Sequence, residues 1–189
     1  MDLQSSTTDV VLFLSVLTIV GQIIAVFLLA ALAFRRGRLT EWTDRHALVL
    51  MFVVSLTATI GSLFFSDIAR WTPCKDCWFQ RIFMYPQVLL LAVALWKKDR
   101  NIAVYILLLC LVGMGIAADH YADQVHAAFF PVPDAEGVNM LLKPCDASGI
   151  SCAKTEIKFT FGYITIPMMS LTAFILNAIG SIYLLRAKK

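Results

Sequence analysis

The chain has 189 residues, of which 59% are hydrophobic and only 15% are charged. A typical soluble domain has about 45–50% apolar and about 25% charged residues, so this composition excludes the ordinary soluble class. The formal net charge is only +3, and no basic stripe is interleaved with aromatic residues, so no nucleic-acid partner is expected. The apolar residues are gathered in blocks long enough to cross a bilayer, which predicts an all-α integral membrane protein.

The first apolar block runs from Val10 to Phe34. At 1.5 Å per residue it spans about 37 Å, enough to cross a hydrocarbon core of about 30 Å with some tilt. A cleaved signal peptide is the alternative, because Ala31–Ala33 resembles a cleavage site. However, a signal peptide has a basic first region and a shorter apolar core, whereas this segment carries Asp2 and Asp9 and no Lys or Arg before the block. We therefore expect a retained span.

Four further apolar blocks follow, each long enough for a membrane-spanning helix. Their ranges are Ala47–Phe65, Trp78–Trp96, Ile102–Ala118 and Tyr163–Leu185. We expect Pro86 and Pro167 to kink their helices. In the fourth block, Gly113 and Gly115 are expected to allow close packing of a neighbouring helix, with the approach of a flat ligand as the alternative. Between the last two blocks, residues 119–161 are expected to form a long, mostly irregular outer loop, because its Pro and Gly residues break any long element.

The orientation follows from the Lys and Arg residues, which cluster at one set of helix ends. This cluster comprises Arg35, Arg36, Arg38, Arg45, Lys97, Lys98, Arg100, Arg186, Lys188 and Lys189. By the positive-inside rule these ends are cytoplasmic, so the N-terminus is expected outside and the C-terminus inside. Both cysteine pairs, Cys74/Cys77 and Cys145/Cys152, then lie on the outer face, where disulfides persist. Cys110 is expected to be a small buried hydrophobic residue inside the fourth span.

The first pair, Cys74-Lys75-Asp76-Cys77, lies directly before the third apolar block. Helix amides and a nearby cation can lower the pKa of a cysteine, and Arg81 follows Cys77 by about one helical turn. This pattern favours redox chemistry. A structural disulfide is one alternative, although closing so short a loop gains little stability. Half of a four-cysteine zinc site is another, although the remaining cysteines do not fit common zinc spacings.

The second pair, Cys145 and Cys152, is less specific, because its spacing alone would suit a structural clip equally well. Beside the first pair, a relay of two disulfides becomes the better interpretation, since thiol–disulfide exchange requires an accessible shuttle. His120 follows the fourth block and could bind a ligand oxygen or donate a proton. The residues alone favour a hydrated interfacial histidine there instead.

A lipid-soluble molecule is the expected electron acceptor. The chain has no G-x-G-x-x-G or P-loop motif for a nucleotide, and Trp78 rather than histidine follows the first cysteine pair, which excludes a c-type haem motif. A thioredoxin-like acceptor also lies about 150 mV below a strongly oxidising exported partner, and transfer over that gap would cost about 7 kcal/mol. A quinone is the acceptor that suits a redox pair at the bilayer edge.

Three segments resemble the disulfide bond formation protein B family, particularly its BdbC branch. Cys74–Pro86 resembles the family signature, and Phe161–Phe174 resembles the last helix of that branch. Ala118–Tyr121 resembles the histidine-bearing end of the helix before the long loop. The resemblance implies a four-helix transmembrane bundle in residues 47–189, preceded in residues 1–46 by an extra N-terminal transmembrane helix and a cytoplasmic loop.

The resemblance also implies residue roles. Cys74 and Cys77 would be the quinone-proximal pair, with Cys77 facing the quinone. Arg81 would bind the quinone and tune the Cys77 thiolate, and His120 would line the same site. The implied quinone is ubiquinone or menaquinone.

Cys145 and Cys152 would form the shuttle pair. Cys145 would be attacked by a DsbA-like thioredoxin-fold partner, and Cys152 would exchange with Cys74. The expected protein is therefore a thiol:quinone oxidoreductase of the bacterial cytoplasmic (inner) membrane that supports disulfide bond formation. Two other functions remain open: a non-enzymatic membrane protein with a disulfide- or zinc-stabilised ectodomain, and a quinone reductase resembling vitamin K epoxide reductases, which the first motif fits less well.

Overall fold

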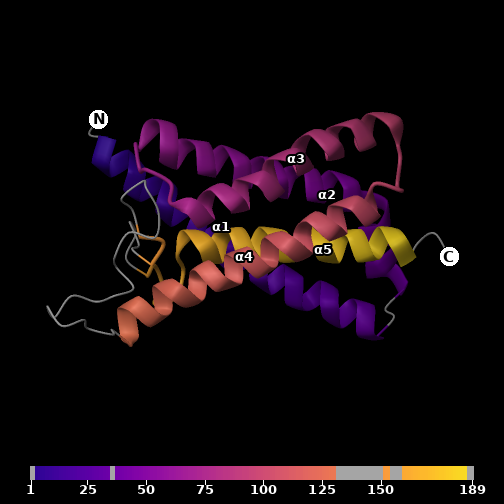
Figure 1. The fold of residues 1–189 in the computed structure, drawn as a ribbon. Helices are drawn as coiled ribbons and strands as arrows, with labels where there is room; N and C mark the ends of the chain where they lie inside the picture. Colours follow the sequence, from indigo (N-terminus) through magenta and orange to yellow (C-terminus); the bar gives the residue numbers. More distant parts are fainter. Residues whose placement is uncertain (1–2, 35–36, 131–150, 154–158, 187–189) are drawn as a thin grey trace, which may run out of the picture.

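The computed structural model describes residues 3–34, 37–130, 151–153 and 159–186. These residues form a bundle of long α-helices (Figure 1), with a short π-helix continuing the second. The elements are α1 (Leu3–Phe34), α2 (Gly37–Leu63), η1 (Phe64–Ile68), α3 (Lys75–Lys97), α4 (Ala103–Phe129) and α5 (Ile166–Arg186). All five α-helices are long and apolar enough to cross a membrane, which confirms the expected all-α membrane fold with one helix ahead of the other four.

The helices run along a common direction, so the bundle has two ends. In Figure 1 the N-terminus, the end of α4 and the start of α5 lie at one end, and the C-terminus lies at the other. Helices α2, α3, α4 and α5 pack around one another, whereas α1 packs mainly against α5. The four later helices therefore make the core, and α1 is attached to its outside.

One helix boundary and one expected kink differ from the sequence-based expectation. The helix α4 continues to Phe129 rather than ending near Ala118, so the first part of the expected 119–161 loop is helical. The apolar block ends near Ala118. Around and beyond this point, Ala117, His120 and Gln124 are buried at helical spacing, so one face of the continued helix still packs against the bundle. Pro167 lies in the first turn of α5, where its missing N–H leaves no bond broken, so the expected kink inside that helix was wrong.

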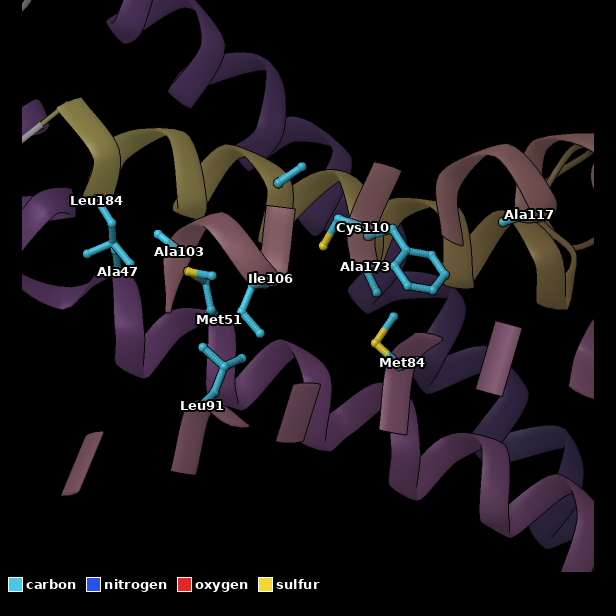
Figure 2. Packing of buried hydrophobic residues seen from close by; sticks show 12 residues of the cluster. Ala47, Met51, Met84, Leu91, Ala103, Ile106, Cys110, Ala117, Ala173 and Leu184 are labelled. Atoms are coloured by element: carbon cyan, nitrogen blue, oxygen red, sulfur yellow. The ribbon is translucent and has the colours of Figure 1, made fainter. Parts of the chain in front are cut away.

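The core is closely packed because small residues face large ones. An added Cβ at Gly113 of α4 would lie 2.4 Å from the Phe174 ring of α5, and one at Gly180 would lie 2.6 Å from Met51 of α2. Figure 2 shows Met51 with other buried side chains that fill the space between the helices. Gly113 thus has the packing role expected of it.

A buried polar cluster joins the four core helices near their middle. Asn177 of α5 donates to Ser55 of α2 at 2.7 Å and to Gln87 of α3 at 2.9 Å. The Cys110 thiol of α4 donates to the same Gln87 oxygen at 3.6 Å. Polar side chains inside a membrane bundle are costly unless they bond one another, so this cluster fixes how the four helices face each other.

Candidate redox site

The two neighbouring cysteines lie where α3 begins. Cys74 is in an extended conformation (φ −71°, ψ 174°) immediately before the helix, and its carbonyl accepts from the Trp78 amide at 3.2 Å, closing the first turn. Its thiol donates to Cys77 Sγ at 3.4 Å. Cys74 is buried, while Cys77 is partly exposed. The helix start therefore holds the two sulfurs within hydrogen-bonding distance in different surroundings.

The pKa of Cys74 is shifted by these surroundings. The hydrogen bond to Cys77 is the largest cause, burial is the second, and together they raise the pKa of Cys74 to about 12. The contact with His120 acts in the opposite direction. Cys74 therefore remains a protonated thiol at neutral pH, and its hydrogen bond favours negative charge on the Cys77 sulfur.

His120 lies beside this pair, although α4 brings it from a distant part of the sequence. It is 1% exposed, so the expectation of a hydrated interfacial histidine was wrong. Its Nε2 atom lies 3.7 Å from Cys74 Sγ and 2.9 Å from the carbonyl oxygen of Cys152, while Nδ1 lies 2.8 Å from Nε2 of Gln80. When the Gln80 amide donates to Nδ1, the ring proton lies on Nε2 and points toward Cys152 and Cys74.

Cys152 reaches the same place from the segment before α5. It is 2% exposed, and its side chain interacts with Cys74 and Asp76. Burial is the main cause that raises the pKa of the Cys152 thiol. The structure thus brings one member of the second pair to one member of the first, whereas Cys145 lies outside the described residues.

Arg81 lies one turn along α3 from Cys77 and is held in a defined position. Its Nε donates to Ser62 Oγ at 3.0 Å and its Nη2 to the Ser62 carbonyl at 3.1 Å. Tyr85 donates to the same hydroxyl at 3.1 Å, and the guanidinium carbon lies 5.2 Å from the centre of the Trp78 ring. These described bonds use two of the five guanidinium N–H donors, which leaves donors for an anionic or carbonyl oxygen.

A cavity of about 360 Å³ connects these groups with the apolar interior of the bundle. Cys74, Cys77, Arg81 and His120 line one part of it. Its remaining walls are largely apolar side chains of α1, α2 and α5, including Leu17, Val53 and Leu176. The cavity is thus polar near the sulfurs and apolar deeper in the bundle.

This cavity fits an amphipathic quinone. Arg81 offers donors for a ring oxygen, the apolar walls suit a hydrocarbon chain, and Gln124 Oε1 at the cavity is buried with no partner among the described residues. Concave, mostly apolar sites with a few placed polar groups are typical of small-molecule binding.

Several residues of the site were missed by the sequence analysis. Gln80 and Gln124 hold or approach His120, and Ser62 and Tyr85 position Arg81. The two glutamines carried a signal, because polar residues within or beside membrane spans tend to mark functional sites. Ser62 carried none, since a lone serine in an apolar helix is common.

The same ligand atoms could also hold a metal ion. Ligand atoms of Cys74, Cys77 and His120 all lie within 4.8 Å of one another. Both ring nitrogens of His120 face protein partners, however, namely Gln80 and the carbonyl of Cys152. A metal at this position would have to displace one of those contacts.

Known proteins are similar to this chain over most of its length. The model of the family described as disulfide bond formation protein DsbB matches residues 44–184. Disulfide bond formation protein C of Bacillus subtilis is 42% identical over 66% of this chain and 82% of its own. A probable disulfide formation protein C of Bacillus cereus is 40% identical over 78% of this chain and 98% of its own. No solved structure matches the chain.

Proposed function

Because the chain belongs to the DsbB family of disulfide bond formation proteins, we propose that it acts as a membrane thiol:quinone oxidoreductase. The observation that carries the proposal is the convergence of two redox-capable segments on one cavity. Cys74 and Cys77 meet Cys152 beside His120, and Arg81 lies at the polar end of an apolar cavity. The family membership itself supports a role in disulfide bond formation.

The first half of the reaction oxidises an exported dithiol of a DsbA-like thioredoxin-fold partner. A partner thiolate attacks Cys145 Sγ of the Cys145–Cys152 disulfide and releases the Cys152 thiolate. The second partner thiol then attacks the mixed disulfide, so the partner leaves as a disulfide and Cys145 and Cys152 remain reduced.

The second half passes the two electrons to the first pair. Cys152 attacks Cys74 Sγ of the Cys74–Cys77 disulfide, which releases Cys77, and Cys145 then attacks Cys152, which releases Cys74. The interaction of the Cys152 side chain with Cys74 supports this order. A quinone, ubiquinone or menaquinone, supplies the oxidising power by accepting two electrons and two protons as it becomes a quinol.

The surrounding residues support charge and proton movement in these steps. The hydrogen bond from Cys74 and the positive charge of Arg81 both act on Cys77, which suits this sulfur to carry the electrons toward the cavity. His120, oriented by Gln80, lies 3.7 Å from Cys74, and its Nε2–H can donate to the Cys74 sulfur when Cys74 leaves as a thiolate. Arg81 binds a ring oxygen through its remaining donors.

The experiment is a quinone reduction assay on the purified protein in detergent with a reduced thioredoxin-fold dithiol protein. Ubiquinone and menaquinone analogues are supplied in turn, and the loss of quinone absorbance is followed. Cys77→Ala is expected to abolish turnover, and Arg81→Lys to raise KM for the quinone, because Lys lacks the planar fork of donors. Cys110→Ala is the matched control, since this buried cysteine lies away from the cavity. Turnover that survives Cys77→Ala would refute the proposal.

A zinc-stabilised membrane protein is the second candidate, because Cys74, Cys77 and His120 form a compact ligand set. Metal analysis of the purified protein tests it directly. One equivalent of zinc that resists dialysis, together with no quinone reduction, would establish it. Absence of zinc in a protein that reduces quinone would exclude it.

A further inference from the structure

The N-terminal helix α1 lies outside the part of the chain that the family model matches, which begins at residue 44. The match with the Bacillus cereus relative likewise covers 98% of that protein but only 78% of this chain. The helix is nevertheless fixed firmly to the core. Gln22 donates to Thr172 Oγ1 at 3.2 Å and accepts from Tyr163 at 2.6 Å, and Tyr183 donates to the Leu28 carbonyl at 2.8 Å.

These bonds join α1 to α5 and to the turn that precedes it, and close packing adds to them. A Cβ at Gly21 would lie 3.1 Å from Leu176 and 3.3 Å from Thr172, so the backbone of α1 approaches α5 closely at this level. Toward α2 the approach is close at one point, where a Cβ at Gly61 would lie 3.0 Å from Leu14. Because α1 packs mainly on α5, it leaves space along α2.

The cavity occupies that space. Its lining includes six residues of α1, which are Leu14, Leu17, Thr18, Val20, Gly21 and Ile24. From Leu14 to Ile24 the helix rises about 15 Å, half the thickness of a hydrocarbon core. Thr18 directs its hydroxyl to the Leu14 carbonyl of its own helix at 2.8 Å, so this wall presents an apolar surface.

We propose that α1 forms the binding wall for the isoprenoid tail of the quinone and gives this protein a preference for long-tailed quinones. The proposal rests on the proposed quinone function. Continuity of the cavity supports it, since the same space that contains Arg81 and Cys77 extends along α1 to Ile24. A flexible hydrocarbon chain is the part of a quinone that matches a long apolar space between helices, because it needs no polar partner.

Neighbouring isoleucines provide a matched test. Ile24 lines the cavity, whereas Ile23 does not, and their exposed fractions are similar at 46% and 51%. Ile24→Trp would fill the part of the cavity that Ile24 lines, and Ile23→Trp would add the same volume on a neighbouring face of the helix that does not line the cavity. The ligands are quinones that share one ring and carry either no tail or tails of increasing length. Each is bound to each variant in detergent.

Two readouts are used, the quinone-induced rise in melting temperature and the KM for quinone reduction. For Ile24→Trp we expect affinity for long-tailed quinones to fall roughly tenfold, about what the lost burial of two methylene groups amounts to. Affinity for the tail-less ring should be unchanged, and Ile23→Trp should match the wild type throughout.

Each outcome separates this proposal from the function on which it rests. If the wild type binds quinone and Ile24→Trp and Ile23→Trp retain the same tail dependence, α1 is not the tail wall, although the proposed function stands. If the wild type binds no quinone of any length, the proposed function fails and the tail site fails with it. If Ile24→Trp does not fold, Leu17→Trp and Val16→Trp make an equivalent pair, because only Leu17 lines the cavity and both are similarly exposed.

Discussion

Cys74 and Cys77 are separated by two residues, yet their surroundings differ because one precedes the helix and the other lies in its first turn. The sequence motif predicted a redox pair, and the positive charge of Arg81 one turn later was also predictable. The contact of Cys74 with His120 was not, because it depends on how α3 and α4 pack. At this scale the motif identified the sulfurs, and the packing determined their neighbours.

The raised pKa of Cys74 makes its labelling dependent on pH. In the reduced protein, alkylation of Cys74 by iodoacetamide, followed by mass spectrometry, should be slow near neutral pH, rise steadily with pH, and level off only near pH 12. The folded protein holds this proton more tightly than the unfolded chain, whose cysteine pKa is about 8.5. The shift therefore stabilises the fold below about pH 8.5, and this stabilisation is lost as the pH rises through about 12.

Two variants check the cause of this shift through opposite effects. Cys77→Ala removes the hydrogen bond that contributes most, so the labelling midpoint of Cys74 should move to lower pH. His120→Ala removes a contact that lowers the pKa, so the midpoint should move to higher pH. Shifts in the same direction for both variants would contradict the assignment.

Helix packing depends on where each small residue faces, which the sequence does not state. Gly113 and Gly115 both lie in α4, but only Gly113 faces Phe174, while an added Cβ at Gly115 would meet nothing within 4 Å. The sequence predicted all five helices and close packing at both glycines, of which only Gly113 has it. The prediction ended α4 too early because it followed hydropathy, which falls where the helix emerges beyond the apolar block.

The two glycines make a paired prediction. Gly113→Ala should lower the melting temperature of the detergent-solubilised protein, because overpacking against an aromatic ring costs about 1–3 kcal/mol. Gly115→Ala should leave the melting temperature unchanged or slightly higher, since alanine favours a helix more than glycine does. Equal destabilisation by the two substitutions would show that the contact with Phe174 is not the cause.

For the whole molecule, the buried cluster of Asn177, Gln87 and Ser55 sets the arrangement of α2, α3 and α5. Asn177→Leu should reduce the free energy of unfolding by about 1–2 kcal/mol in a denaturant titration, because it removes the hydrogen bonds that join α5 to Ser55 of α2 and Gln87 of α3. Ser181→Ala is the matched control, since among the described residues the hydroxyl of Ser181 bonds the Asn177 carbonyl of its own helix and no other helix. A Ser181→Ala effect as large as that of Asn177→Leu would contradict this account.

Orientation in the membrane is also a property of the whole molecule. The clustered Lys and Arg residues predict the N-terminus and the cysteine site outside and the C-terminus in the cytoplasm. In cells whose membrane is accessible to protease, an epitope at the N-terminus should be removed and one at the C-terminus should survive. The reverse pattern would place the redox site in a reducing compartment and would be incompatible with the proposed function.

The sequence by itself determined the five spans and the redox motif, because both depend on short stretches of residues: apolar blocks of sufficient length, and a Cys-x-x-Cys at a helix start followed by Arg81. The residue patterns alone did not bring His120 or Cys152 to Cys74; the family resemblance implied it, and the tertiary structure shows the contacts. Only the tertiary structure decided that Ser62 holds Arg81 and that α1 lines the cavity. These contacts join residues far apart in the chain. They are set by which helix faces pack together, and the hydropathy pattern inside a membrane does not distinguish those faces from the ones that meet lipid.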